Sequence, residues 1–299
     1  MTKPKVKWGR ESLQNLQVLE KVQRQLDART RQYRVSRKPN ISNGLRKKLE
    51  LRAAQDLNSV NPISRIQVAI SLFEKLESHF QEHAVDDAYF VTLISEKHGV
   101  RASDRNGYDV AAHRVWIETV LSGMSYVGMI EPAYYPAVSF IPPANEDWIS
   151  WHAHVVVWDT TAAALKDLKE IINESENSFR PGGTVFHYRT ARPNRIEAEI
   201  AYMCKSPRSG YYTYPAKRIV IDPATRKSIR VSTGTFKQNK RELRTGKLLI
   251  ALSAMEDLSI EQLLVSGGEG RGLGSAALLS AKQVLQEQQR LRDEALRSL

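Results

Sequence analysis

The residues most suggestive of chemistry in this chain are two histidines separated by one residue, His152 and His154. They lie in an apolar run from Trp151 to Trp158 whose β-branched and aromatic content favours a strand. Because side chains alternate along a strand, both imidazole rings project from the same face. Two neutral imidazoles placed in this way can converge on one divalent cation. The alternative is a half-buried pair that is hydrogen-bonded within a sheet.

A third ligand has to come from a neighbouring strand, and Glu131 is the first candidate. It ends an apolar run that begins at Tyr126. We expect this run to form a strand that pairs with the histidine strand, the two being joined by the long connection 132–150. A carboxylate added to two imidazoles suits Mg²⁺ or Mn²⁺ better than histidine alone. Glu146, in the connection itself, is a weaker candidate. The alternative for Glu131 is a solvated acid at a strand end.

Three further polar residues, Glu199, Tyr202 and Lys205, are spaced three apart in a predicted helix over 195–205. This spacing places them on one helix face over two turns. A tyrosine hydroxyl has a pKa near 10 and needs a nearby cation to favour its phenolate. Lys205 can supply that cation and can also bind a phosphate. The alternative is an ordinary amphipathic helix with a charged surface face.

The elements that must position these residues alternate regularly along the chain. The patterns predict, in order, a helix from Ser64, which we expect to be its N-cap, then a strand at 88–95, a helix at 109–121, strands at 126–131 and 151–158, a helix from Thr160, a strand at 184–188 and the helix at 195–205. This order predicts an α+β fold in which a central antiparallel sheet carries helices on one face, the split strand-helix-strand plan.

Charge is distributed in blocks along the 299 residues. Residues 1–52 carry 15 lysines and arginines against 4 acids, and residues 205–247 carry 12 against 2, whereas residues 53–204 carry 12 against 20. Basic blocks of this density favour a polyanionic partner, most often nucleic acid, since phosphate contacts release counterions. The alternative is a solvated tail. The second block includes a predicted basic hairpin, with strands at 218–222 and 228–232.

Composition excludes several other classes of protein. The single cysteine, Cys204, rules out internal disulfides and cysteine-rich zinc sites. We find no run of about 18 apolar residues and no apolar stretch near the N-terminus of the kind that marks a secretory signal. We therefore expect a cytoplasmic protein with no membrane partner. A Gln-rich helix is predicted over 275–299, after a glycine-rich stretch at 267–272 that we expect to be flexible.

Taken together, the motifs resemble those of rolling-circle replication initiators in the HUH endonuclease superfamily. The run 89–95 (Tyr-Phe-Val-Thr-Leu-Ile-Ser) is similar to their first motif, 151–157 to the histidine motif, and 201–205 (Ala-Tyr-Met-Cys-Lys) to the tyrosine motif. The strand 126–131 resembles the one ahead of the histidines in plasmid initiators. The resemblance covers about residues 85–215. It implies an HUH endonuclease-like domain at 61–215, between a basic N-terminal extension at 1–60 and a hairpin and helical segment at 216–299.

The resemblance implies a site-specific endonuclease and strand transferase acting on single-stranded DNA at a replication origin. Tyr202 would attack the phosphate, and Mg²⁺ or Mn²⁺ held by His152, His154 and Glu131 would polarise it. Lys205 would stabilise the developing charge, and Glu199 would activate the terminating water. The chain carries no phosphate-binding glycine-rich loop of a helicase, so a host helicase would be recruited.

Three readings stay open beside this one. The same chemistry would serve a single-tyrosine transposase or a relaxase, and a DNA-binding regulator would need no chemistry at all.

Two other segments carry expectations of their own. Tyr211, Tyr212 and Tyr214 are expected in a loop, where they stack on bases or pack against the protein. We expect residues 1–52 to hold DNA without forming a core, so that a chain starting near Asn61 folds and still cleaves. The opposing view is that the leucines of this segment fill a groove on the sheet.

Overall fold

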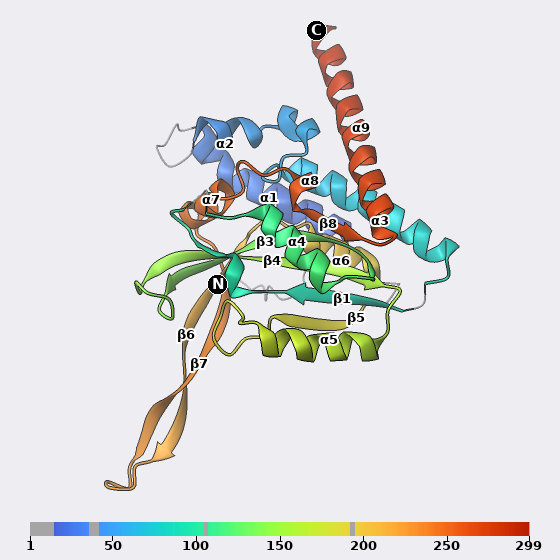
Figure 1. The fold of residues 1–299 in the computed structure, drawn as a ribbon. Coiled ribbons are helices and arrows are strands. Elements are labelled where there is room, and N and C mark those ends of the chain that lie inside the picture. Colours follow the sequence, from blue (N-terminus) through green and yellow to red (C-terminus); the bar gives the residue numbers. More distant parts are fainter. Residues whose placement is uncertain (1–14, 36–41, 86, 105–106, 192–194, 299) are drawn as a thin grey trace, which may run out of the picture.

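The structure is a computed structural model, and it describes residues 15–35, 42–85, 87–104, 107–191 and 195–298 (Figure 1). Its helices are α1 (Leu16–Val35), α2 (Asn43–Lys48), α3 (Pro62–Glu82), α4 (Val110–Val120), α5 (Ala162–Ser175), α6 (Ile196–Met203), α7 (Thr245–Ser253), α8 (Ile260–Leu263) and α9 (Gly270–Arg297). Its strands are β1 (Ala88–Leu93), β2 (Gly99–Arg101), β3 (Ser125–Val138), β4 (Glu146–Trp158), β5 (Phe186–Ala191), β6 (Ser209–Ile221), β7 (Ser228–Glu242) and β8 (Leu264–Gly267).

The α+β class is confirmed, and the sheet has the order β5-β1-β4-β3-β6-β7, with β2 beside β4 and β8 beside β3. β1 pairs antiparallel with β4 and β5, and β3 pairs antiparallel with β4. β3 meets β6 in a parallel pairing at Tyr134 and Gly210, so the sheet is mixed and the prediction of an antiparallel sheet was wrong at this point. The chain reaches β6 from α6, and this crossover permits the parallel direction.

Helices cover both faces of the sheet, so the prediction of helices on one face was also wrong. On one face Trp158 of β4 contacts His79 and Phe80 of α3. On the other face Trp151 stacks on Tyr108, just before α4, with ring centroids 4.0 Å apart. Figure 1 shows α3 and α9 on one side of the sheet and α5 on the other. Burial on both faces explains why the histidine strand is almost continuously apolar.

β3 and β4 are longer than predicted because much of the connection 132–150 is itself strand. Their pairing runs from Ser125 opposite Trp158 to Val138 opposite Glu146. At the other end of the domain, α3 begins at Pro62, and Asn61 is its N-cap, with a side chain that accepts hydrogen bonds from the backbone N–H of Ile63 and Ser64. The prediction that Ser64 caps this helix was therefore wrong. Proline is well suited to the first helical position, since it has no N–H to leave unpaired there.

One hydrophobic core draws on all three predicted segments of the chain. Leu19 of α1, Leu72 of α3, Val155 of β4, Leu248 of α7 and Ala281 of α9 are each fully buried in it. The division at 60/61 and 215/216 stays a prediction about function, because packing does not separate the three parts. No helix in the described parts of the chain is long and apolar enough to span a membrane.

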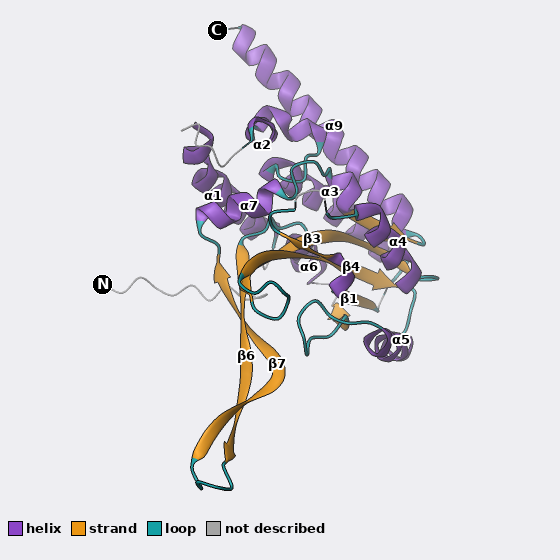
Figure 2. Cartoon of the chain, turned by 60° about the vertical axis from the view of Figure 1, so that its left-hand side comes forward, coloured by secondary structure: helices purple, strands orange, loops and turns teal. Residues whose placement is uncertain are grey.

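The strands β6 and β7 form a long two-stranded ribbon that extends well beyond the body of the molecule (Figures 1 and 2). The ribbon contains the predicted hairpin and also Tyr211, Tyr212 and Tyr214, which lie in β6 and not in the loop we expected.

The glycine-rich stretch at 267–272, which we expected to be flexible, belongs to regular secondary structure, since Gly267 ends β8 and Gly270 begins α9. A Cβ on Gly270 would lie 2.0 Å from the carbonyl oxygen of Tyr126, so only glycine fits at this helix–strand contact.

Candidate metal and tyrosine site

The register of β3 on β4 brings the three predicted metal ligands together. Glu131 lies directly opposite His152, and His154 lies two residues further along the same face of β4. One ligand atom from each residue falls within 4.8 Å of the others, and all three side chains are buried. Glu131 follows the stretch of β3 that pairs with β8 and precedes the residue that pairs with β6. Among the described strands, only β4 is paired with β3 at Glu131, and α6 contacts β3.

The two histidines direct the same ring nitrogen toward the centre of the cluster. Their Nε2 atoms are 3.1 Å apart, and Nε2 of His152 is 3.9 Å from Oε2 of Glu131. Nδ1 of His152 lies 3.3 Å from the carbonyl oxygen of Ser150, which can only accept a hydrogen bond. The proton of this imidazole therefore sits on Nδ1, and the Nε2 lone pair faces the cluster.

The donor set fits a divalent cation. Nδ1 of His154 lies 2.9 Å from Oγ1 of Thr92, so both imidazoles have the outer hydrogen bond that orients a metal-binding histidine. The other carboxylate oxygen of Glu131, Oε1, is buried and has no hydrogen-bond partner among the described residues. Nitrogens each about 2.0–2.2 Å from one ion lie roughly 3 Å apart, which is the separation of these two Nε2 atoms. Two imidazoles and one carboxylate are ligands that Mn²⁺ accepts.

Burial and neighbouring cations set the charges in the cluster. Burial lowers the pKa of His152 to about 3, and Lys205 adds to this effect, so the imidazole is neutral at physiological pH. Burial raises the pKa of Glu131, whereas the positive charges of Lys205 and Arg65 act in the opposite direction. A bound cation would act in the same direction as these two side chains, and neutral imidazole is the form that binds metal.

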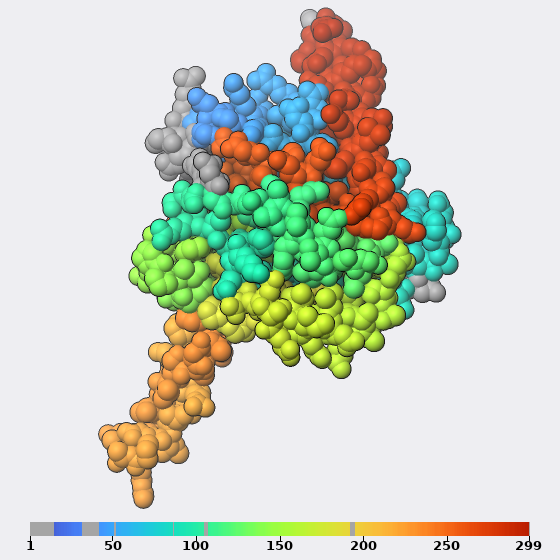
Figure 3. All heavy atoms as spheres, viewed as in Figure 1, coloured from blue at the N-terminus to red at the C-terminus, as the bar shows by residue number. Residues whose placement is uncertain are grey.

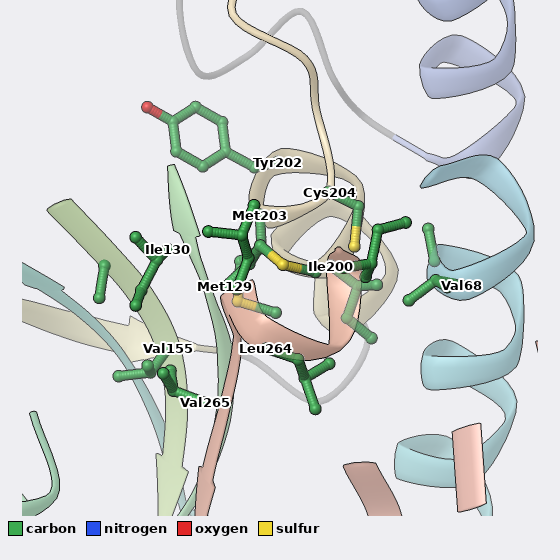
Figure 4. Close-up of a cluster of buried hydrophobic side chains, with 14 of the residues drawn as sticks. Val68, Met129, Ile130, Val155, Ile200, Tyr202, Met203, Cys204, Leu264 and Val265 are labelled. Carbon is green, nitrogen blue, oxygen red and sulfur yellow. The ribbon is translucent and has the colours of Figure 1, made fainter. Parts of the chain in front are cut away.

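Tyr202 and Lys205 lie directly beside the three ligands. The ammonium group of Lys205 forms an ion pair with Glu131, donates a 3.0 Å hydrogen bond to the carbonyl oxygen of Tyr202, and lies 3.6 Å from the centre of the Tyr202 ring. The same ring meets that of His154 edge-on at 4.9 Å. Figure 4 shows the tyrosine hydroxyl directed away from the apolar cluster around Ile200 and Met203. Tyr202, Lys205 and the three candidate metal ligands thus form one continuous group.

The helix that carries Tyr202 is shorter than predicted. α6 ends at Met203, with Cys204 as its C-cap, so Lys205 lies beyond the helix. The three-residue spacing correctly brought Tyr202 and Lys205 together, although the lysine reaches the tyrosine by folding back from the segment after the helix. The first turn of α6 carries Glu199, which the sequence placed on the same face.

Glu199 and Glu146 both form ion pairs with arginines outside the cluster. Glu199 is buried and forms an ion pair with Arg189 of β5, whose guanidinium lies 4.8 Å from the centre of the Phe90 ring. Its predicted role in activating water stays a prediction. Glu146 forms a 2.9 Å ion pair with Arg101 and begins β4, six residues before His152, so it lies about 20 Å along the strand from the cluster.

Arg65 is a buried member of the site that sequence reasoning missed. Its side chain is 1% exposed, and its guanidinium donates hydrogen bonds to the carbonyl oxygens of Cys204 and Lys205 at 3.2 and 3.0 Å. It therefore holds the backbone from which Lys205 projects. A signal was present, because Arg65 precedes Val68, Ala69 and Leu72 at helical spacing on the apolar face of α3.

Lys240 is the second missed residue, and it comes from the ribbon. Its ammonium lies 5.9 Å from the centre of the Tyr202 ring and 5.5 Å from that of Tyr211, its cross-strand neighbour. The base of the ribbon thus places a second lysine beside the tyrosine, although the sequence assigned it to a separate segment. The pattern of β7 alone contains no signal for this approach.

The arrangement suits chemistry on an anion. A buried tyrosine lies beside two lysines and a group of residues that can hold a divalent cation. Positive charge of this kind stabilises both a phenolate and a phosphate. No family model, curated protein or solved structure matches this chain.

Proposed function

We propose that this protein is a metal-dependent DNA endonuclease and strand transferase that cleaves single-stranded DNA through a phosphotyrosine intermediate. The single observation that carries the proposal is the position of Tyr202, whose ring contacts both Lys205 and His154 beside Glu131. A tyrosine so close to a site suited to a cation is placed to attack an ester of phosphoric acid. The replication-origin role, and the recruited helicase, rest on the motif resemblance.

In the proposed reaction the Tyr202 oxygen attacks the scissile phosphorus and loses its proton. A new bond forms between this oxygen and phosphorus, the bond from phosphorus to the 3′-oxygen breaks, and the 3′-oxygen takes up a proton. The products are a 5′-phosphotyrosine link and a free 3′-hydroxyl. Attack by a 3′-hydroxyl reverses the step, so strands can be rejoined without a nucleotide cofactor.

Each neighbouring side chain has a defined task in this reaction. Lys205 stabilises the charge on the tyrosine oxygen and, with Arg65, offsets the charge of Glu131. Lys240 is placed to hold a phosphate near the ring. A divalent cation bound by Glu131, His152 and His154 would supply positive charge to the non-bridging phosphate oxygens. Positioning and electrostatic stabilisation are the usual main contributions in phosphoryl transfer.

The nucleophile is tested by trapping labelled DNA on the protein. We expect wild type to form a denaturation-resistant adduct with a labelled single-stranded oligonucleotide in Mn²⁺, and Tyr202→Phe to form none while it still binds DNA. Tyr214→Phe is the matched control, because this tyrosine is 42% exposed on the ribbon and should leave the adduct yield unchanged. Undiminished adduct in Tyr202→Phe would transfer the role to another tyrosine.

The metal site is tested by binding and by cleavage. We expect His152→Ala or His154→Ala to abolish Mn²⁺ binding measured by titration calorimetry and to lower cleavage by about 10²-fold or more, by analogy with the loss of one preorganised electrostatic group. His83→Ala, an exposed position outside the cluster, is the control. Full cleavage in EDTA would contradict a metal-dependent reaction.

A non-catalytic DNA-binding protein is the second candidate, and one observation favours it. The Thr92 hydroxyl can donate a hydrogen bond to Nδ1 of His154, and the Nε2–H of His154 can then donate one to Nε2 of His152. The two histidines can therefore be fully hydrogen-bonded without a metal ion. In that protein Lys205 would be the permanent partner of Glu131. Absence of both the adduct and Mn²⁺ binding would favour this candidate. A transposase or relaxase would give the same adduct and is separated by its DNA substrate.

A further inference from the structure

The outer part of the β6–β7 ribbon, residues 217–232, has no role in the reaction described above. We refer to these residues as the distal ribbon. Its strands pair only with each other, with Lys217 opposite Ser232 and Ile221 opposite Ser228. The space-filling view shows this part projecting from the body of the molecule (Figure 3). An isolated two-stranded ribbon is marginally stable in water, so its exposure needs a reason.

The distal ribbon exposes apolar side chains that a free surface strand usually avoids. The exposed fraction is 68% for Ile219, 70% for Ile221 and 43% for Ile229. Side chains alternate between the two faces of the ribbon, so Ile219 and Ile221 lie on one face, and Val231 and Ile229 lie on the other. Apolar groups exposed together on a projecting element mark a surface that another molecule covers.

Cations are interleaved with these apolar groups. Arg230 lies opposite Ile219, and Arg218 lies opposite Val231, so each face carries both kinds of side chain. Among the described residues, Lys217, Arg218 and Arg230 form no ion pair. The positive charge of the distal ribbon is therefore available to a partner.

The one acidic residue of the distal ribbon offsets only a single charge of its five cations, Lys217, Arg218, Arg226, Lys227 and Arg230. Asp222 accepts hydrogen bonds from the Thr225 hydroxyl and from the backbone N–H of Ala224 within the tip turn. These bonds lower the pKa of Asp222, and its carboxylate is committed to shaping the turn. A surface that combines unpaired cations with apolar groups fits a partner with negative charge outside and apolar edges inside.

The ribbon is fixed at its base and changes direction before the distal part. Phe236 contacts Phe140 at 5.1 Å, and its carbonyl oxygen accepts a hydrogen bond from Arg180, so the proximal strands are held to the body. The register then shifts, because Pro215 pairs with Phe236 while Lys217 pairs with Ser232. Gly234 lies in this bulge with φ 75°, a conformation that favours glycine. Bulges of this kind re-aim a strand.

We infer that the distal ribbon inserts into the major groove of duplex DNA beside the strand that Tyr202 cleaves. The paired strands are about 5 Å apart, and the major groove is about 12 Å wide and admits a two-stranded ribbon. Five residues per strand extend about 17 Å, enough to follow the groove across several base pairs. The lysines and arginines contact phosphates on the groove walls, and the isoleucines contact thymine methyl groups. The placement beside the cleaved strand rests on the proposed function, whereas duplex binding does not.

Binding is tested with the full chain carrying Tyr202→Phe in EDTA, so that cleavage cannot intervene. We expect Arg218→Gln with Arg230→Gln to weaken binding to a 30-base-pair duplex and to lower the slope of log affinity against log salt by about 1.8, or 0.9 per lost phosphate contact. Lys282→Gln with Arg292→Gln is the matched control, because these cations of α9 are also exposed. An unchanged slope in the ribbon variant would overturn the inference, as would an equal loss in the control.

The groove and the apolar contacts need a second measurement. Replacing thymine by uracil throughout the duplex should weaken wild-type binding by about tenfold, because the isoleucines lose their contacts with the thymine methyl groups. Ile219→Ser with Ile221→Ser should bind the thymine duplex as weakly as wild type binds the uracil duplex, with no further loss on uracil. Competition by netropsin but not by methyl green would place the ribbon in the minor groove and contradict the inference.

The outcomes also separate this inference from the proposed function. If wild type forms the tyrosine adduct while the ribbon variants bind duplex DNA normally, the inference fails and the proposed function stands. If the adduct is absent while the variants lose duplex binding, the proposed function fails and the groove contact stands. Binding of the distal ribbon to anionic vesicles, with unchanged duplex affinity, would assign it to a different partner and overturn the inference.

Discussion

Two strongly basic segments flank the acidic middle of this chain, and they differ in how far they are buried. Residues 1–52 and 205–247 have similar compositions, because each is rich in lysine and arginine and poor in acids. In the first segment, α1 packs against α3 and α6 and buries Leu19, Val22 and Leu26. The second contributes the ribbon, whose outer half is exposed. Net charge therefore says little about whether a segment belongs to the core.

The period of the apolar residues accounts for the difference. In α1 they recur every three or four positions, which makes one continuous stripe that a helix can bury. In the distal ribbon they alternate on two faces, and no second sheet covers either face. One cation of α1 also contacts the rest of the protein, since Arg29 donates hydrogen bonds to Glu242 and to the carbonyl oxygen of Leu243.

The largest effect that can test this comparison is removal of each segment in turn. The sequence led us to expect that a chain starting near Asn61 folds, but the packing favours the alternative in which leucines fill a groove. Removal of residues 1–60 also deletes Ser59, whose carbonyl oxygen accepts a hydrogen bond from the buried Arg65. We expect this shortened chain to be aggregated or unfolded by circular dichroism.

The matched change is replacement of residues 217–232 by a short turn. Because these residues pair only with each other, the shortened ribbon should leave the melting temperature within a few degrees of wild type. A folded and active chain without residues 1–60 would restore the original expectation. Loss of folding on shortening the ribbon would contradict the comparison too, because the distal ribbon would then be needed for folding.

Single leucines and isoleucines sharpen the same contrast. Leu19→Ala should lower the free energy of unfolding by about 3–4 kcal/mol, because the side chain is fully buried and its loss leaves a cavity. Ile219→Ala on the ribbon should change it by no more than about 0.5 kcal/mol. Urea denaturation of both variants measures the difference. Equal effects would mean that α1 is held no more firmly than the ribbon.

Lysines in the two environments should also differ. Lys205→Met leaves the buried Glu131 without its ion-pair partner and should cost about 2–3 kcal/mol of unfolding free energy. Adding Glu131→Gln should restore most of that loss, because the uncompensated charge is then gone. Lys217→Met on the exposed ribbon should be neutral. Failure of the double variant to recover stability would show that Lys205 acts through packing rather than charge.

The smallest effect is the pH dependence of the unfolding free energy, and we expect it to arise from buried histidines in the body and not from the ribbon. Burial lowers the pKa of His113 to about 2, and the Tyr108 hydroxyl is 2.8 Å from its Nδ1. Below an unfolded pKa of about 6.5 the unfolded chain binds a proton that the folded chain excludes, so stability falls as pH falls. From pH 7 to pH 5 this histidine should cost about 2 kcal/mol.

Burial also lowers the pKa of His98, which stacks on His113, so the two histidines act in the same direction. Urea denaturation at pH 7, 6 and 5 should give a smaller acid loss in His113→Phe or His113→Gln than in wild type. The chain with the shortened ribbon should keep the wild-type pH dependence, since the ribbon has no group that titrates in this range. An unaltered pH dependence in both histidine variants would contradict the assignment.

Local patterns in the sequence were enough to predict most elements of the domain and most side chains of the candidate site. His152 and His154 share a face because a strand has a period of two, and this needs no tertiary information. Tyr202 and Lys205 were correctly paired, and the α+β class followed from the order of helices and strands. Fold details that depend on distant contacts were less accessible, as the mixed sheet and the helices on both faces show.

The sequence by itself determined which residues can bind a cation or attack a phosphate, because side-chain chemistry and local period are properties of short segments. The tertiary structure decided how they meet and which distant residues join them. Strand register placed Glu131 opposite His152, the end of α6 at Met203 let Lys205 fold over Tyr202, and the base of the ribbon brought Lys240 to the same ring. Register, helix termination and crossovers depend on contacts between residues far apart in the chain, and a local pattern does not contain them.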